Sequence, residues 1–122
     1  MNESAEDYIK TIYILKQSKN CVRSIDIANE LGFSRASVSI AMTNLRKKNI
    51  IVMSKDGSIE FTDTGRKLAE EIHDKYLMLV EFLQSVAGVD EKTAKEDACK
   101  MEHCLSDLTY KGMRRYIKRK VI

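Results

Sequence analysis

The sequence predicts a mainly α-helical protein, with an N-terminal winged helix-turn-helix domain followed by a C-terminal helical dimerisation domain. The chain of 122 residues has no proline and only five glycines, which suits long helices with few interruptions. Its predicted elements run in the order helix, helix, turn, helix and hairpin before a long helix begins. Residues 76–80 are apolar on nearly every side of that helix, which favours burial at a subunit interface. The domain boundary is expected near Thr62, giving domains 1–62 and 63–122.

Three helices are expected in the first domain. Ser4 and Asp7 form an S-x-x-D capping signal at the start of the first helix. Ser24 is a suitable N-cap for the second helix, and Gly32 ends it. Ser34 then begins the third helix, which has apolar side chains at helical spacing on one face. The expected spans are 3–18, 24–31 and 34–49.

A β-hairpin is expected directly after the third helix. The runs IIVMS (50–54) and SIEF (58–61) read as short strands, and the segment Lys55-Asp56-Gly57 between them is a turn signal. A hairpin in this position is the wing of a winged helix-turn-helix.

The second domain is expected to be entirely helical. Its long first helix begins at Thr62 or Thr64 and extends to about Val86. A shorter helix begins near Asp90, and Ser106 caps the last one.

A gap in acidic residues indicates binding to double-stranded DNA. No aspartate or glutamate lies between Leu31 and Lys55, although the chain has 18 acidic residues. The gap covers the third helix, which a helix-turn-helix inserts into the major groove, and the tip of the wing. Ser34 can equally be a cap, and the basic residues at 46–48 can instead complement the helix dipole. The candidate DNA contacts are Ser34, Arg35, Ser37, Ser39, Thr43, Asn44, Lys47 and Lys55.

Three potential metal ligands occur together in the second domain. Cys99, Glu102 and His103 stand at i, i+3 and i+4, which places them on one side of a helix beside an apolar stripe. A thiolate, a carboxylate and an imidazole are a partial ligand set for a divalent transition metal. The spacing alone also fits a solvated Glu–His pair next to a small core cysteine.

Composition excludes several classes of function. Three cysteines, an odd number, give no disulfide framework, and no apolar run resembles a signal peptide or a membrane span. We therefore expect a cytoplasmic protein with reduced thiols and no membrane partner. The sequence contains no H-E-x-x-H motif, no glycine-rich phosphate loop and no Ser–His–acid set, so neither an enzyme nor a small-molecule substrate is expected.

Two alternative functions remain open at this point, a winged helix that binds proteins and has no DNA role, and a redox switch. A winged-helix thiol switch would regulate transcription through oxidation of Cys99 or Cys104, without metal. Their i, i+5 spacing is poor for an intrahelical disulfide. The sequence assigns no role to Cys21.

Several segments together resemble the diphtheria toxin repressor and manganese transport regulator family of bacterial transcriptional regulators. They are EDYIKTIYIL, SIDIANELG, SRASVSIAMTNL, TDTGRKLA and, most specifically, ACKMEHCLSD. The resemblance covers nearly the whole chain, without the further small domain of the family's longer members. It implies a homodimeric, metal-activated repressor that binds operator DNA and controls metal-uptake genes.

The resemblance also implies a ligand set. The family's primary site takes one ligand from the first helix and three from the helix that holds the triplet. The matching residues are Asp7, Cys99, Glu102 and His103, with the Cys99 carbonyl or a water completing the shell. Asp7 can instead be only the acidic residue of the helix cap. Cys99 in place of a carboxylate is similar to the iron branch, so Fe²⁺ is favoured and Mn²⁺ comes next.

Two departures from the family pattern affect the expected stoichiometry. Lys10 stands where the manganese branch has a further acidic ligand, and Tyr76 stands where both branches have a histidine. The second metal site therefore looks dismantled, and we expect one ion per protomer. The Lys10 ammonium is expected to substitute for the second cation.

Overall fold

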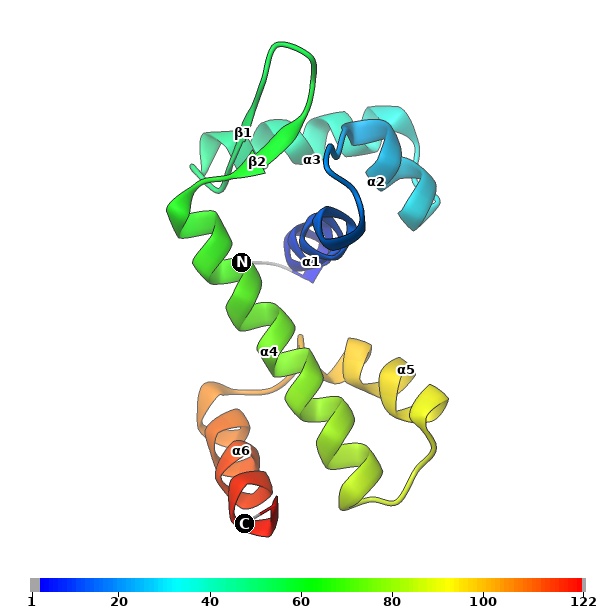
Figure 1. Ribbon diagram of the computed structural model, residues 1–122, viewed down its shortest axis with the longest axis vertical. Coiled ribbons are helices and arrows are strands. Elements are labelled where there is room, and N and C mark those ends of the chain that lie inside the picture. The colour runs from blue at the N-terminus through cyan, green and yellow to red at the C-terminus, as the bar shows by residue number, and fades with distance from the viewer. Residues whose placement is uncertain (1–2, 122) are drawn as a thin grey trace. The chain divides into compact units, whose positions relative to one another are not determined.

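A computed structural model describes residues 3–121 and divides the chain into two compact units, Met1–Glu71 and Ile72–Ile122. The described residues form six helices and one two-stranded sheet, which confirms the predicted fold class (Figure 1). The division falls within the fourth helix. The elements are α1 (Glu3–Ser18), α2 (Ser24–Leu31), α3 (Arg35–Lys47), β1 (Ile51–Met53), β2 (Ile59–Phe61), α4 (Asp63–Ser85), α5 (Glu91–Met101) and α6 (Asp107–Val121).

The first unit packs α1, α2 and α3 around one apolar core. The helix α1 contacts both α2 and α3, and α3 also contacts β1. Ile9, Ile12, Ile27 and Val38 have no exposed surface, as the helical spacing of apolar residues requires. This core holds α3 by one face and leaves its other face at the surface.

The ends of these helices follow from local sequence, with two departures from expectation. Gly32 adopts φ 70° and closes α2, and the Ser34 hydroxyl accepts a hydrogen bond from the Ser37 N–H, as predicted. The N-cap of α2 is Arg23 rather than Ser24, because the Asp26 carboxylate accepts a hydrogen bond from the Arg23 N–H. Ser4 already lies within α1, so the S-x-x-D pattern does not mark the start of that helix.

The hairpin is antiparallel and pairs Ile51 with Phe61, Val52 with Glu60 and Met53 with Ile59. Ile51 and Ile59 are buried, whereas Val52 is about half exposed, so the hairpin covers the core with one face. The Ile59 N–H also donates to the Val22 carbonyl at 2.8 Å, which ties the hairpin to the segment before α2. The hairpin is therefore held against the other elements of the first unit.

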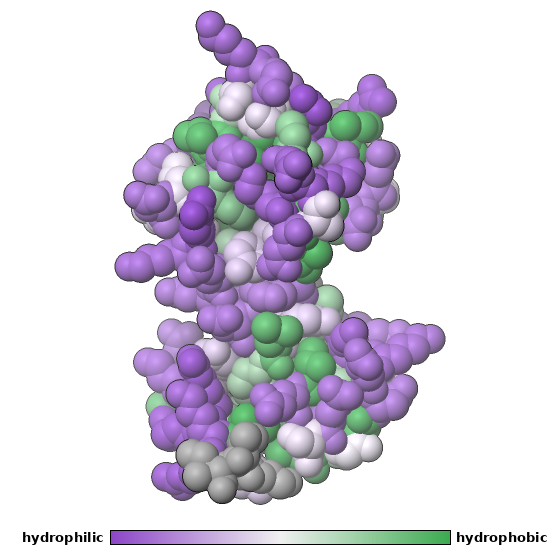
Figure 2. Space-filling view, in the orientation of Figure 1, coloured by the Kyte–Doolittle hydropathy of each residue, from purple (hydrophilic) through white to green (hydrophobic). Residues whose placement is uncertain are grey.

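The second unit packs the later part of α4 with α5 and α6. Met78, Leu79 and Ala98 form its buried cluster, and partly buried side chains from all three helices surround it. Within the single chain Leu77 is 49% exposed, so burial of 76–80 on every side would require a second subunit. Leu108 and Tyr116 of α6 are also exposed, and hydrophobic residues reach the surface of this unit in Figure 2. Among residues 3–121, no helix has the length and apolarity needed to cross a bilayer.

Candidate DNA-binding surface and metal-ligand pair

The exposed face of α3 carries the predicted DNA contacts. Val38, Met42 and Leu45 are buried, and the other residues of α3 are exposed except Ala41, which is half-buried. The eight predicted contact residues are all at the surface, including Lys55 at the hairpin turn. Burial therefore leaves the basic, acid-free side of α3 available to a ligand.

Three of the predicted contacts already use their hydroxyl groups inside the protein. The Ser34 hydroxyl donates to the Ser37 hydroxyl at 2.9 Å while accepting from the Ser37 N–H, so Ser34 is a cap. The Thr43 hydroxyl donates to the Ser39 carbonyl at 3.0 Å, one turn earlier. Because the Thr43 hydroxyl is engaged in this way, the methyl group is the part of the side chain that is available to contact DNA.

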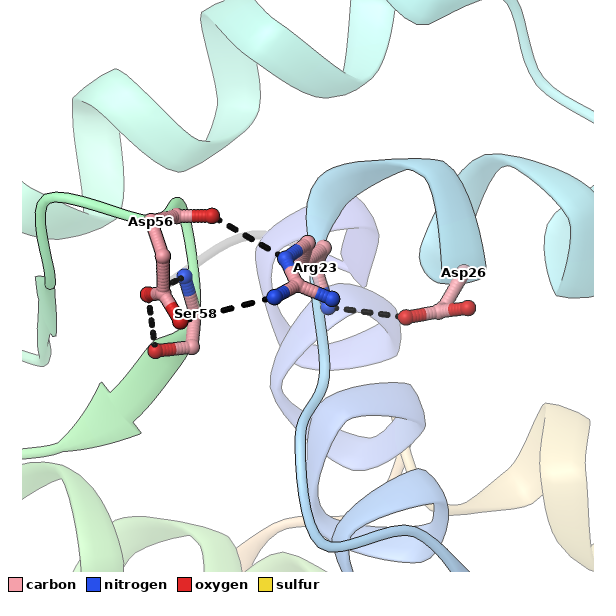
Figure 3. Close-up of polar contacts among 4 residues, drawn as sticks. All are labelled: Arg23, Asp26, Asp56 and Ser58. Carbon is pink, nitrogen blue, oxygen red and sulfur yellow. Dashed lines mark hydrogen bonds and ion pairs between the residues drawn. The ribbon is translucent and has the colours of Figure 1, made fainter.

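The wing is held by an arginine that the sequence had not singled out. Arg23 donates from Nε to the Asp56 carbonyl at 3.0 Å and from Nη2 to the Asp56 carboxylate at 3.4 Å (Figure 3). Asp56 also accepts hydrogen bonds from the backbone N–H and the hydroxyl of Ser58, at 3.1 and 2.7 Å. These contacts join the start of α2 to the hairpin turn that carries Lys55. The two residues lie 33 positions apart, so no local pattern indicated the pairing.

The hydrogen bonds and charges around Arg23 favour the ionised forms of Asp56 and Asp26. The Ser58 hydrogen bonds, with a smaller contribution from Arg23, lower the pKa of Asp56 below its ordinary value. The pKa of Asp26 is also lowered, first by the Arg23 N–H and then by Lys19, whose Nζ lies 2.9 Å from Oδ1. Because both folded-state pKa values are depressed, the stabilisation is present at neutral pH and is lost as the pH falls below about 4.

Replacing Arg23 with Gln is expected to loosen the wing and weaken DNA binding by about three- to tenfold. The variant loses two contacts at an exposed position, where solvent screens the charges and each contact contributes little to stability, so the fold should persist. Fluorescence anisotropy gives the affinity, and ¹⁵N relaxation of residues 54–58 gives the mobility of the turn. Lys19→Gln is the matched control, because it removes a cation from Asp26 without touching the wing. Unchanged relaxation of residues 54–58 in Arg23→Gln would show that Arg23 does not hold the wing in place.

A carboxylate and an imidazole lie together in the second unit. His103 Nε2 is 3.5 Å from Glu102 Oε1, and the two side chains are 4% and 1% exposed. The helix α5 ends at Met101, earlier than expected, so Glu102 is its C-cap and His103 lies in the following turn. The Glu102 N–H still donates to the Ala98 carbonyl at 3.0 Å, which fixes the backbone at the pair.

The other predicted ligands have different surroundings. Cys99 lies on an exposed part of α5, unlike the buried pair that follows it. Asp7 lies on α1 of the first unit, where its carbonyl accepts a hydrogen bond from the Thr11 hydroxyl at 2.8 Å. Tyr76, at the position where the resemblance places a histidine, stacks with His73, with ring centroids 6.4 Å apart.

An exposed recognition helix beside an anchored wing defines a winged-helix DNA-binding protein. Residues 1–59 match the family model described as "Iron dependent repressor, N-terminal DNA binding domain". Residues 62–120 match the model "Iron dependent repressor, metal binding and dimerisation domain". The chain therefore belongs to the family of metal-dependent transcriptional repressors that includes the diphtheria toxin repressor and the manganese regulator MntR. This confirms the resemblance seen in the sequence.

Individual relatives support the same assignment. The chain is 30% identical to the diphtheria toxin repressor of Corynebacterium diphtheriae, over 86% of this chain and 46% of that one. It is 35% identical to the HTH-type transcriptional regulator MntR of Geobacillus kaustophilus, over 84% and 72% of the two chains. Its fold resembles a solved "Manganese-dependent transcriptional repressor complex with manganese", with a TM-score of 0.86, 23% identity and coverage of 93% and 52%. The chain thus spans about half the length of the diphtheria toxin repressor and of the manganese-bound structure. These named relatives are transcriptional regulators rather than enzymes.

Proposed function

We propose that this protein is a metal-activated repressor that binds operator DNA as a homodimer and controls genes for metal uptake. The observation that carries the proposal is the buried Glu102–His103 pair, located in the segment that matches a metal-binding and dimerisation domain. In this proposal residues 1–62 bind DNA, and residues 63–122 bind metal and dimerise. The relatives give no support to a thiol switch.

The proposed ligands are Asp7, Cys99, Glu102 and His103. Two ligands of one cation, each at about 2.1 Å, lie roughly 3.0–3.4 Å apart, close to the 3.5 Å between His103 Nε2 and Glu102 Oε1. Oxygen and nitrogen donors of this kind fit Mn²⁺, Fe²⁺ and Zn²⁺. Asp7 and Cys99 join the set on the strength of the family resemblance, with the Cys99 thiolate or carbonyl as donor.

The regulatory effect would follow from where these ligands lie along the chain. When bound, the cation supplies positive charge that offsets the repulsion between the Asp7 and Glu102 carboxylates. Asp7 belongs to the DNA-binding unit, and the other ligands belong to the unit that dimerises. Ligands contributed by both units would limit how far the units move, favouring the spacing of about 34 Å that two reading heads need on DNA. Coupling of this kind is typically about 1–3 kcal/mol per effector.

For the metal we propose Fe²⁺ first and Mn²⁺ second. The thiolate of Cys99 moves the preference of the site toward Fe²⁺. The name of the solved relative points instead to manganese, and the matched family models are named for iron. Test-tube affinity favours Zn²⁺ over both ions, so selection in the cell would rest on which ion is available.

We propose one ion per protomer. Lys10 lies one helical turn after Asp7 on α1 and is only 8% exposed, so the sequence places a buried basic residue close along the helix to a proposed ligand. Replacing Lys10 with Glu is expected to raise the bound metal from about one to about two ions per protomer, measured by isothermal titration and elemental analysis. Lys10→Met, which removes the charge without adding a ligand, is the control. Stoichiometry that stays at one in Lys10→Glu would contradict the role of Lys10.

For DNA we propose that α3 enters the major groove and that the wing contacts a phosphate. Arg35, Lys47 and Lys55 supply charge, and Ser37, Ser39 and Asn44 supply short polar side chains. Thr43 contributes chiefly its methyl group, and Ser34 joins the contacts beside its role as a cap. The exposed apolar residues of α4 and α6 support dimerisation of the second unit. A cytoplasmic location, with neither a membrane partner nor a small-molecule substrate, belongs to the same proposal.

The proposal is tested by anaerobic titration of the protein onto labelled DNA from its own promoter region. Anisotropy is recorded with chelator, then with Fe²⁺ and with Mn²⁺. Tightening of about a hundredfold on adding metal is expected, because two protomers each contribute their coupling. Equal affinity with and without metal would overturn metal activation while leaving the DNA-binding unit intact.

A further inference from the structure

We propose that Ile40 of α3 determines operator specificity by apolar contact with the methyl group of a thymine in the major groove. This inference rests on the proposed DNA-binding function and deepens it, because it names a base feature that the protein reads. Ile40 was not among the contacts expected from the sequence.

The position of Ile40 on α3 is the first part of the argument. Ile40 is 64% exposed, more than any other large apolar residue of the first unit among those described. At about 100° per residue, Ile40 lies roughly opposite the buried line of Val38, Met42 and Leu45. It therefore projects farthest from the core, where a recognition helix approaches base edges most closely.

The neighbours of Ile40 on this outer line are the second part. Ala36 lies one turn before it, is exposed and is apolar. Thr43 lies three residues after it and commits its hydroxyl to the Ser39 carbonyl, which leaves its methyl group for an outside contact. The centre of the exposed face is thus a short apolar ridge of Ala36, Ile40 and Thr43, and polar and basic side chains flank it.

The chemistry of DNA identifies what such a ridge fits. In the major groove, the C5-methyl of thymine is the apolar group among hydrogen-bond donors and acceptors. The surroundings favour a nucleic acid as the ligand, because Arg35, Arg46 and Lys47 are exposed on the same helix and 32–54 holds no acidic residue. Isoleucine also has no structural reason to be here, since an exposed β-branched residue lowers helix propensity slightly relative to alanine.

The test uses duplex DNA in which single thymines are replaced by uracil, which lacks only the methyl group. Duplexes are first selected by the metal-loaded protein from a random library, and each thymine of the selected site is then replaced in turn. We expect one position per half-site at which uracil weakens binding about fourfold, the effect of losing one buried methyl contact. Replacing both half-sites together should weaken binding by about the square of that factor.

Variants assign the effect to one side chain. Ile40→Ala should bind thymine and uracil equally at that position, and Ile40→Leu should retain part of the discrimination. Ile14→Ala, which removes an isoleucine 42% exposed on α1, should discriminate as the unchanged protein does. Uracil without effect at every position, or discrimination kept in Ile40→Ala, would overturn the role of Ile40 alone. Failure to select any duplex would overturn the DNA-binding function and this inference with it.

Discussion

Replacing Glu102 with Gln is expected to abolish the metal-dependent tightening of DNA binding, a loss of about a hundredfold in affinity at saturating metal. The amide keeps the size of the side chain but removes its charge, and a cation holds a neutral amide far more weakly than a carboxylate. Glu102 is buried 3.5 Å from His103, so the substitution removes the charge of one member of the proposed ligand pair. Anisotropy with chelator and with Mn²⁺ or Fe²⁺ measures the loss.

Glu91→Gln provides the matched control on the same helix. Glu91 is 66% exposed and pairs with Lys95, at 2.7 Å, which lowers the pKa of Glu91. An exposed pair at i, i+4 is screened by solvent and contributes little to stability, so this variant should respond to metal as the unchanged protein does. A full metal response in Glu102→Gln would remove Glu102 from the proposed ligands. Equal losses in both variants would indicate a general effect of acidic charge on α5.

The fold of the first unit could be predicted from the sequence because the signals that determine it are local. The acid-free gap, the cap at Ser34, the left-handed residue Gly32 and the Lys55-Asp56-Gly57 turn each act within a few residues. Local sequence also indicated that α4 begins near Thr62, whose hydroxyl accepts a hydrogen bond from the Gly65 N–H at 3.0 Å. These features are set by backbone conformation and capping, so a single sequence is enough to find them.

The features that were not predicted from the sequence depend on contacts between distant residues or on burial. Arg23 meets Asp56 only because the hairpin folds back toward α2, and no spacing rule reports such a contact. The periodic pattern around Glu102 and His103 continued past the end of α5, although the backbone turns there. The apolar ridge at Ile40 became apparent only when burial identified the side of α3 that faces away from the core.

Gly65 is a position where the structure requires glycine, although nothing in the local sequence pattern indicated this requirement. It lies in the first turn of α4, where a Cβ atom would come 1.9 Å from the carbonyl oxygen of Ile50. The contact cannot open easily, because the Thr62 N–H donates to the same Ile50 carbonyl at 3.0 Å and the Thr62 hydroxyl donates to the Asn49 carbonyl at 2.7 Å. The close approach of α4 to the segment between α3 and the hairpin thus requires glycine.

Gly65→Ala is therefore expected to destabilise the first unit by about 3 kcal/mol, because the clash involves backbone on both sides. Urea unfolding gives the total loss. Amide exchange at Ile59 and Thr62 locates it, since both N–H groups hold the hairpin region and should exchange much faster.

Gly112→Ala makes the same chemical change where space is available. Gly112 lies inside α6, and its added Cβ would meet only the side chain of Arg115, at 3.8 Å. Alanine should stabilise α6 by about 0.5–1 kcal/mol, because it loses less backbone entropy than glycine in a helix. The same substitution should thus have opposite signs at 65 and 112. A loss below about 0.5 kcal/mol in Gly65→Ala would mean that α4 can shift away from Ile50. The wing would then owe its position to contacts such as Arg23 with Asp56 and the Ile59–Val22 hydrogen bond.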